Sequence, residues 1–441
     1  MHGYLAGAAT ARAGDEMSGP ALLLLGFAVT GHPATGSGLL AGLTIAAAAG
    51  GPVFGALLDR SRRPDRFLAG TLAAYALGIV AVQAAVGRLP APTVIAVALA
   101  AGLFNPAVTG GWTAQLPRIV TGRGLDHGSA FDALTYSAAS LAGPALAAGV
   151  AARFGARAAV LTAAALLVLA MPSACSLSRY RPPTAPDRIT RDGIAQDRIT
   201  QDRITQDRIT RDRIVRNWII RDGIGLGRQM AAGFGVIVAR RPLLRATVTS
   251  VVSYAGIGML LVCCPLLGAQ RLGGPSRGAL LVSAIAVASL AGNAVLARRA
   301  GRGQPDVRVL ASTLIIGVSM AAVALAPGWL TLAAVALAGV GEGPQLTALF
   351  AVRHRETPAH LRGQVYTTAA SLKIAGMAAG AALAGPLAGH SAAACLLVAA
   401  GTELCAAAAY LLTGPRGHAA AGAPAGRACT DSARDSEVRS G

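Results

Sequence analysis

Twelve apolar stretches, each about as long as a membrane-spanning helix, constrain this chain more than any other feature of its sequence. A helix needs about 20 mostly apolar residues to cross the hydrocarbon core of a bilayer. Six stretches come first, a polar gap follows, and six more come after it. They lie near 4–30, 38–57, 67–86, 93–116, 132–151, 158–177, 246–268, 279–297, 309–326, 329–351, 365–388 and 391–413. The pattern predicts an all-α polytopic membrane protein with twelve transmembrane helices in two six-helix bundles.

The same pattern divides the chain into four predicted regions. Residues 1–177 form an N-terminal six-helix bundle, and 178–230 a charged, repeat-containing cytoplasmic linker. Residues 231–413 form a C-terminal six-helix bundle with a preceding surface helix, and 414–441 a disordered cytoplasmic tail.

The linker contains units similar to DRITQ, repeated every five residues over 187–216. A five-residue step produces neither the apolar stripe of a helix nor the alternation of a strand. The repeat therefore indicates a disordered connection that can be deleted with little effect; a segment that docks a partner is the alternative. Residues 217–241 are less polar and are predicted to form a helix on the inner leaflet.

Composition excludes a soluble enzyme. Hydrophobic residues make up 54% of the chain and charged residues 13%, about half the charged share of a soluble domain. Lys373 is the only lysine, and it lies inside an apolar stretch, so no nucleotide-binding P-loop is present. Neither HExxH nor cysteine and histidine ligands at metal spacing occur. The sequence therefore predicts no enzyme, no cofactor, no metal and no disulfide.

The distribution of the basic residues predicts the topology. Of the 39 arginines and lysines, 32 lie in every second connecting segment, in the central gap or in the C-terminal tail, and five lie in the opposite loops. Because cytoplasmic loops carry the excess of basic residues, both termini and the linker are predicted to be cytoplasmic in a multi-pass protein of the cell membrane. The arginines are not gathered on one face, which argues against a nucleic-acid partner.

The loop after the second stretch carries the strongest local motif, Gly55 to Arg63, which reads GALLDRSRR. A glycine lets two helices approach, Asp59 can cap or pair at a helix end, and Arg60 and Arg63 can anchor at the inner leaflet. The segment resembles the G-x-L-x-D-R-x-x-R-R loop of the major facilitator superfamily, in the position that this family uses. A generic basic turn is the alternative.

The resemblance covers both six-helix halves and implies the two pseudo-symmetric bundles of that family. Gly143-Pro144 resembles the glycine-proline pair of the family's antiporter motif, although Ala147-Ala148 replaces the usual glycine pair. Overall the chain is similar to siderophore and macrolide exporters. The resemblance implies a monomeric secondary transporter that exports a small amphipathic substrate in exchange for protons. An uptake permease and a membrane sensor or scaffold that transports nothing are the alternatives.

Ionisable residues inside the stretches are candidates for function, because a charge in hydrocarbon is costly. We expect Asp15, Glu16, Glu342 and Lys373 to serve proton coupling or to line a substrate cavity. In the alternative, Arg12 neutralises the two carboxylates that follow it at i+3 and i+4.

Lys373 is expected to have a carboxylate partner. Counted from the inner ends of their stretches, Lys373 and Glu342 lie at a similar depth, about 14 Å at 1.5 Å per residue. An ion pair between the two is therefore predicted, with Glu403 in the last stretch as the rival partner.

Overall fold

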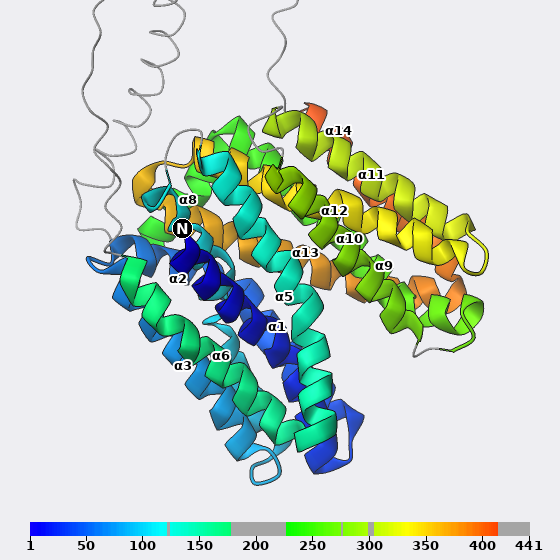
Figure 1. The fold of residues 1–441 in the computed structure, drawn as a ribbon, viewed down its shortest axis with the longest axis horizontal. Coiled ribbons are helices and arrows are strands. Elements are labelled where there is room, and N and C mark those ends of the chain that lie inside the picture. The colour runs from blue at the N-terminus through cyan, green and yellow to red at the C-terminus, as the bar shows by residue number, and fades with distance from the viewer. Residues whose placement is uncertain (121–123, 178–225, 275–276, 299–303, 413–441) are drawn as a thin grey trace, which may run out of the picture.

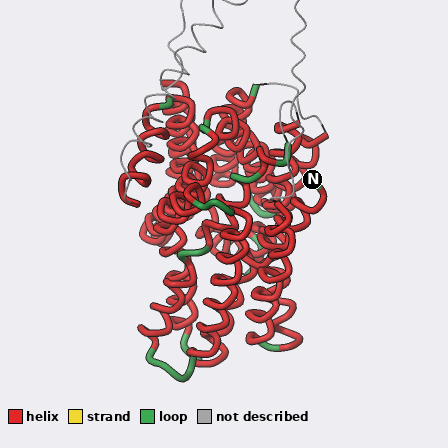
Figure 2. Tube along the Cα trace, turned by 90° about the vertical axis from the view of Figure 1, so that its left-hand side faces the viewer, coloured by secondary structure: helices red, strands yellow, loops and turns green. Residues whose placement is uncertain are grey.

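The computed structural model describes residues 1–120, 124–177, 226–274, 277–298 and 304–412 (Figure 1). The predictions for the repeat 187–216, for most of the linker and for the tail fall outside these residues. Within the described ranges every regular element is a helix, and short loops join the helices (Figure 2).

The first bundle contains six long helical segments. Its elements are α1 (His2–Thr30), α2 (Pro33–Arg60), α3 (Pro64–Ala85), α4 (Ala91–Gly102), η1 (Ala107–Gly111), η2 (Leu116–Arg118), α5 (Gly124–Phe154) and α6 (Ala156–Ser176). Helix α1 packs against α5 and α6, and α3 packs against α4 and α6. Gly31 ends α1 in the left-handed region, at φ 70°, which favours glycine. Prolines open α2 and α3, where the missing N–H costs no helix hydrogen bond.

The second bundle repeats this design. Its elements are α9 (Arg241–Arg271), α10 (Gly278–Arg298), α11 (Pro305–Leu325), α12 (Leu330–Glu356), η5 (Ala359–Leu361), α13 (Arg362–His390) and α14 (Ala392–Leu412). Helix α9 packs against α13 and α14, and α12 packs against α10 and α11. A shorter helix, α8 (Leu226–Ala239), precedes the bundle.

The prediction of an all-α polytopic membrane protein is confirmed, with eleven of the twelve predicted spans found as candidate spans. Eleven segments of the described chain are long and apolar enough to cross a bilayer. The twelfth bundle helix, α1, has 29 residues but carries Arg12, Asp15 and Glu16 near its middle. Those charges are accommodated because α1 packs inside its bundle, where Arg12 is buried.

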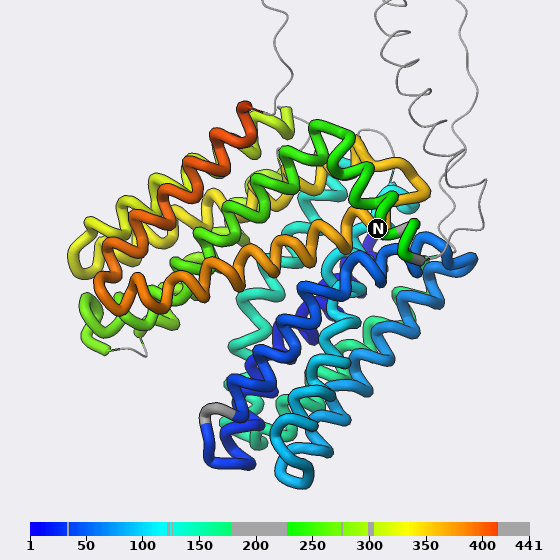
Figure 3. The backbone as a smooth tube through the Cα atoms, turned by 180° about the vertical axis from the view of Figure 1, so that it is seen from behind, coloured from blue at the N-terminus to red at the C-terminus, as the bar shows by residue number. Residues whose placement is uncertain are grey.

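The two bundles converge at one end of the molecule and diverge toward the other (Figures 1 and 3). The end where they converge holds the start of α1, the end of α6, helix α8 and the end of α14; it is called the linker end below, and the opposite end the far end. Helix α2 packs along α13, and α5 packs along α10 and α12. These contacts join the halves.

The fourth span differs from its prediction. A continuous helix was expected over 93–116, but α4 ends at Gly102 and a π-helical turn, η1, follows Pro106. Proline has no N–H to donate to the preceding turn, and π-helical turns occur frequently at functional sites. The break falls beside Asn105, which is part of the site described below.

Helix α8 lies within the stretch 217–241 that was predicted to form a surface helix. Helix α8 begins at Leu226 and packs against α2, α9 and α13. Its residues Val236 and Ile237 are buried with Leu243, Leu361 and Val365. Part of the apolar surface of α8 is therefore covered by the protein, while Phe234 and Val238 of the same helix are exposed. The position of α8 on the inner leaflet stays a prediction.

Candidate functional site

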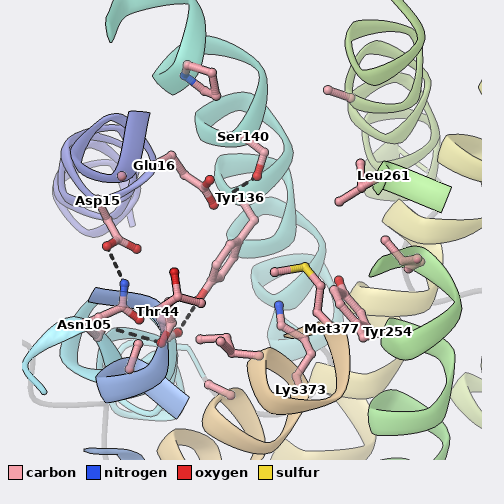
Figure 4. A pocket seen from close by; sticks show the side chains of 18 of the residues that line it. Asp15, Glu16, Thr44, Asn105, Tyr136, Ser140, Tyr254, Leu261, Lys373 and Met377 are labelled. Carbon is pink, nitrogen blue, oxygen red and sulfur yellow. Dashed lines mark hydrogen bonds between the residues drawn. The ribbon is translucent and has the colours of Figure 1, made fainter. Parts of the chain in front are cut away.

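A cavity of about 420 Å³ lies between the two bundles (Figure 4). Its walls come from both halves, chiefly from α1, α2 and α5 on one side and from α9, α10, α12 and α13 on the other. All four ionisable candidates from the sequence line it: Asp15, Glu16, Glu342 and Lys373. A volume of this size fits a small-molecule site.

Asp15 is held by two groups of its own bundle. Its Oδ1 accepts a hydrogen bond from the Tyr75 hydroxyl at 2.9 Å and another from Asn105 Nδ2. Asn105 reaches Asp15 from the break in the fourth span, next to Pro106. The irregular backbone there positions the amide that orients the carboxylate (Figure 4).

Glu16 lies at a close approach of α1 and α5. Its Oε1 accepts a hydrogen bond of 3.1 Å from Ser140, one turn before Gly143 and Pro144. A side chain on Gly143 would meet the Glu16 backbone carbon at 2.8 Å, so glycine is what allows this approach. Pro144 lines the cavity beside it. The glycine-proline pair thus lies against Glu16.

Lys373 does not form the predicted ion pair. Its Nζ lies 4.5 Å from the centre of the Tyr254 ring and 5.6 Å from that of Tyr136, and no carboxylate of the described chain comes within 4.0 Å of it. Glu342 lines the same cavity, but no ion pair joins it to Lys373. Aromatic faces provide the contact instead.

The rival partner, Glu403, lies inside the C-terminal bundle and away from Lys373. It is fully buried in the C-terminal bundle, where its Oε1 accepts a hydrogen bond of 2.8 Å from Ser253. It does not line the cavity.

Arg12 does not neutralise its two neighbours either. Its guanidinium forms an ion pair of 3.0 Å with Asp132, and both side chains are almost completely buried. Tyr4 donates to the same carboxylate at 2.8 Å, and Thr113 does so at 2.8 Å. The Tyr136 ring covers the guanidinium at 3.8 Å. The ion pair of Arg12 is therefore with a residue distant in sequence and not with the two carboxylates that follow it.

An aromatic cluster lies between the cavity and the linker end. Tyr136 of α5 lies 5.9 Å from Phe350 of α12, ring centre to ring centre, and Phe350 lies 6.2 Å from Tyr366 of α13. These residues are buried together with Ala114, Ala133 and Leu346. Because the cluster draws on both bundles, it joins them beneath the cavity.

Helices α2 and α13 meet in a second contact between the halves, called the α2–α13 joint below. Both carboxylate oxygens of Asp59 accept hydrogen bonds of 2.8 Å from the backbone N–H groups of Gly363 and Gln364, at the start of α13. Further along, the joint is held by Thr367 Oγ1 donating to Gly51 O at 2.6 Å and by Ser371 Oγ donating to Ala47 O at 2.7 Å. Asp59 therefore caps a helix of the opposite half.

The structure brings only part of the predicted loop motif into the joint. Gly55 is buried, and a side chain there would meet Thr367 and Gln364 of α13. Arg60 and Arg63 are exposed. The glycine and the aspartate contact the other half, whereas the side chains of the two arginines lie at the surface.

Several cavity residues were not singled out from the sequence. Asn105 donates to Asp15, and the rings of Tyr136 and Tyr254 lie against Lys373, yet each is one of several uncharged polar residues in its stretch. The break at Pro106 was the available signal for Asn105, because proline inside a span interrupts its hydrogen bonds. Nothing local marks the two tyrosines.

Comparison with known proteins shows which family and which solved structures the chain is similar to. The sequence model of the Major Facilitator Superfamily matches residues 4–381. No curated protein sequence matches. Three similar solved structures are a bacterial homologue of the iron transporter ferroportin in an outward-facing state, the human organic anion transporter MFSD10 (TETRAN) and the proton:xylose symporter XylE.

All three comparisons cover nearly the whole chain. The ferroportin homologue is 13% identical with a TM-score of 0.70, and the alignment covers 93% of this chain and 98% of the homologue. MFSD10 is 17% identical with a TM-score of 0.65, at 93% and 98% coverage. XylE is 12% identical with a TM-score of 0.63, at 92% and 93% coverage. At such identities the likeness concerns the fold.

Proposed function

This chain belongs to the major facilitator superfamily, and from that premise we propose that it exports a small amphipathic molecule across the cell membrane in exchange for protons. The family and the structural neighbours indicate a transporter rather than an enzyme. Members of this family carry small-molecule substrates and often ions. Export, proton coupling, the cell membrane and a monomeric state are the parts that we propose.

One observation carries the proposal: the cavity lies between the two halves and takes charged groups from both. A scaffold has no need of carboxylates facing an internal space, since each charge there is costly. In a transporter, a site between two bundles can be exposed to either side as the bundles rock. The position of Asp15, Glu16 and Glu342 in the cavity therefore supports transport over a purely structural role.

Asp15 and Glu16 are proposed to carry the coupling protons. Each has one oxygen bonded within its own bundle, Oδ1 to Tyr75 and Asn105 and Oε1 to Ser140. The second oxygen of each carboxylate can take a proton or a cationic substrate group, but not both at once. Such competition is what an exchange of substrate for protons requires.

The linker end is proposed to face the cytoplasm, because the basic residues gather in the segments at that end. With that orientation the α2–α13 joint and the aromatic cluster close the cytoplasmic side. The structure then corresponds to an outward-facing state.

Flux measurements in proteoliposomes test the proposal. A pH gradient across the vesicle membrane is expected to drive accumulation of substrates from a panel of amphipathic compounds. Asp15→Asn and Glu16→Gln should each reduce gradient-driven flux, because each removes a carboxylate that can take a coupling proton. Glu403→Gln, a buried glutamate outside the cavity, is the matched control. Unchanged gradient-driven flux in both cavity variants would contradict the proton-coupling role. Accumulation of substrate driven by a pH gradient of the opposite direction would indicate uptake instead of export.

A further inference from the structure

The ammonium group of Lys373 lacks a hydrogen-bond acceptor. No described residue accepts a hydrogen bond from Nζ or pairs with it, and its contacts are the ring faces of Tyr254 and Tyr136. A ring face attracts the positive charge but leaves the three N–H donors of an ammonium group unbonded. Glu342 lines the same cavity but stays outside ion-pair distance of Lys373. Lys373 can therefore bind an acidic group that enters the cavity.

The carboxylates of α1, by contrast, have no cation paired with them. Arg12, the cation nearest in sequence, is committed to Asp132. Neutral groups, namely Tyr75, Asn105 and Ser140, provide the hydrogen bonds to Asp15 and Glu16. The α1 wall thus carries negative charge without a paired cation, which favours binding of a positively charged group.

The two charged regions belong to different bundles. In Figure 4, Asp15 and Glu16 come from α1 on one side, and Lys373 comes from α13 on the other, with the Tyr136 ring between them. The C-terminal side also carries Glu342, Tyr254 and Ser289, and apolar side chains, among them Ile257, Leu261 and Met377, line much of the rest. The cavity therefore has two carboxylates on the α1 side, and on the other side a lysine without an ion-pair partner together with an apolar surface.

We propose that the substrate is a zwitterionic amphiphile: its cationic group binds the carboxylates of α1, its acidic group binds Lys373, and its apolar body packs against Tyr136 and the side chains of α9 and α13. A singly charged ligand leaves one of the two regions without a counter-charge. A zwitterion supplies a counter-charge to both regions and so connects the two halves through the cavity. The inference rests on the proposed transport function and adds the class of substrate.

The single lysine of the chain makes a direct test possible. An amine-acetylating reagent modifies Lys373 and the α-amino group of Met1, and mass spectrometry of the purified full-length protein measures each rate separately. Three probes share a ring and differ in charge: 4-(trimethylammoniomethyl)benzoate, benzyltrimethylammonium and benzoate. Quaternary ammonium groups do not consume the reagent.

The zwitterion is expected to slow acetylation of Lys373 about tenfold more than benzoate does at equal concentration, because one additional charge-assisted contact is made. Benzyltrimethylammonium should protect Lys373 least, and Met1 should react at the same rate throughout. In the double variant Asp15→Asn/Glu16→Gln, the zwitterion should protect Lys373 from acetylation no better than benzoate does. In Glu403→Gln, the zwitterion should still protect Lys373 better than benzoate.

Equal protection by the cation, or protection by none of the three probes, would overturn the inference. So would an undiminished advantage in a double variant whose thermal unfolding matches that of the wild type. Flux of the radiolabelled zwitterion in proteoliposomes separates the two claims: protection of Lys373 without any flux leaves the site in place and removes the transport function.

Discussion

Gly143 shows how one missing side chain can position a charged group. A Cβ there would lie 2.6 Å from the Glu16 Cβ and 3.0 Å from the Met17 nitrogen, so α5 could not approach α1 as it does. Two helices in a bilayer gain little from burial and depend on such close packing. The glycine therefore determines how far Glu16 stands from the opposite wall.

Gly143→Ala is expected to destabilise the protein by about 1–3 kcal/mol, because backbone atoms of α1 cannot move aside cheaply. Gly149→Ala on the same helix is the control, since nothing lies within 4 Å of its added methyl group; it should be neutral or slightly stabilising. Denaturant titration in detergent micelles measures both. Equal stability of the two variants would contradict this view of Gly143.

The pair of Arg12 and Asp132 illustrates a second effect at this scale. Both charges are removed from water and from lipid, and each satisfies the other. Breaking such a pair leaves a buried charge without a partner.

Asp132→Ala should therefore cost about 3–5 kcal/mol of folding free energy. The double variant Arg12→Met/Asp132→Leu should recover most of that loss, because no unpaired charge remains. The free energy of unfolding of the wild type, both single variants and the double variant gives the coupling energy. Additive losses would show that the two side chains do not stabilise each other.

At the scale of the element, α13 depends on a residue of the other half for its first turn. The N–H groups at the start of a helix have no partner within it, and Asp59 accepts two of them. Opening the linker end must break these hydrogen bonds, so they stabilise the closed form of that end.

Asp59→Ala should favour opening of the linker end by about 1.5–3 kcal/mol, the range for hydrogen bonds to a charged group. Spin labels at Arg62 and His360, two exposed positions on opposite halves, report the separation. The distance distribution should widen in Asp59→Ala and stay unchanged in Asp65→Asn, an acidic residue at the start of α3. Ligand affinity measured in the closed state should change little; a large loss would place Asp59 in the binding site instead.

Helix α8 lies on the same joint. Gln364 donates from its side chain to Met230 O at 2.9 Å while its backbone N–H is bound to Asp59. The movement of α13 and the docking of α8 are therefore coupled through one residue.

Gln364→Ala should loosen α8 and accelerate hydrogen exchange of the amides of 226–239 by about fivefold, corresponding to the roughly 1 kcal/mol of one neutral hydrogen bond. Gln304→Ala, an exposed glutamine before α11, is the control. Mass-spectrometric hydrogen exchange measures both. Unaltered exchange in α8 would show that apolar contacts alone hold the helix.

For the whole molecule, the contacts between the halves determine which conformations are accessible. Besides the α2–α13 joint, Ser137 of α5 lies with its hydroxyl 3.0 Å from that of Ser289 of α10. Asn293 donates to the same Ser137 hydroxyl at 2.9 Å and accepts from Thr347 at 2.8 Å. Ser137 separates from Ser289 and Asn293 if the bundles rock.

A disulfide between Ser137→Cys and Ser289→Cys, in a variant without the six native cysteines, should prevent that separation. Transport is expected to fall to background on oxidation and to return on reduction, because rocking of the bundles requires α5 and α10 to part. Each single cysteine variant under the same oxidation is the control. Full transport by the crosslinked protein, with the crosslink verified by mass spectrometry, would contradict alternating access through this contact.

Much of the architecture could be predicted from local sequence alone. Hydrocarbon requires about 20 apolar residues per span and satisfied backbone groups within each helix, so the stretches predicted the position of most bundle helices. The exceptions are the fourth span, which is interrupted after Gly102, and α5, which begins at Gly124 rather than near 132. Asp15, Glu16, Glu342 and Lys373 stood out for the same reason, since a charge in an apolar stretch is costly. The GALLDRSRR loop indicated the family through spacing.

Tertiary structure alone decided which of these groups meet. Arg12 pairs with Asp132, at a separation of 120 residues, and not with the carboxylates one turn away; Lys373 rests on aromatic rings and not on Glu342. Asp59 caps α13 across 304 residues. Charge and hydrophobicity depend on the residue itself and can be read along the chain, whereas a partner depends on helix rotation, on depth and on where a glycine lets two backbones approach. Those quantities are determined only when all the helices pack together.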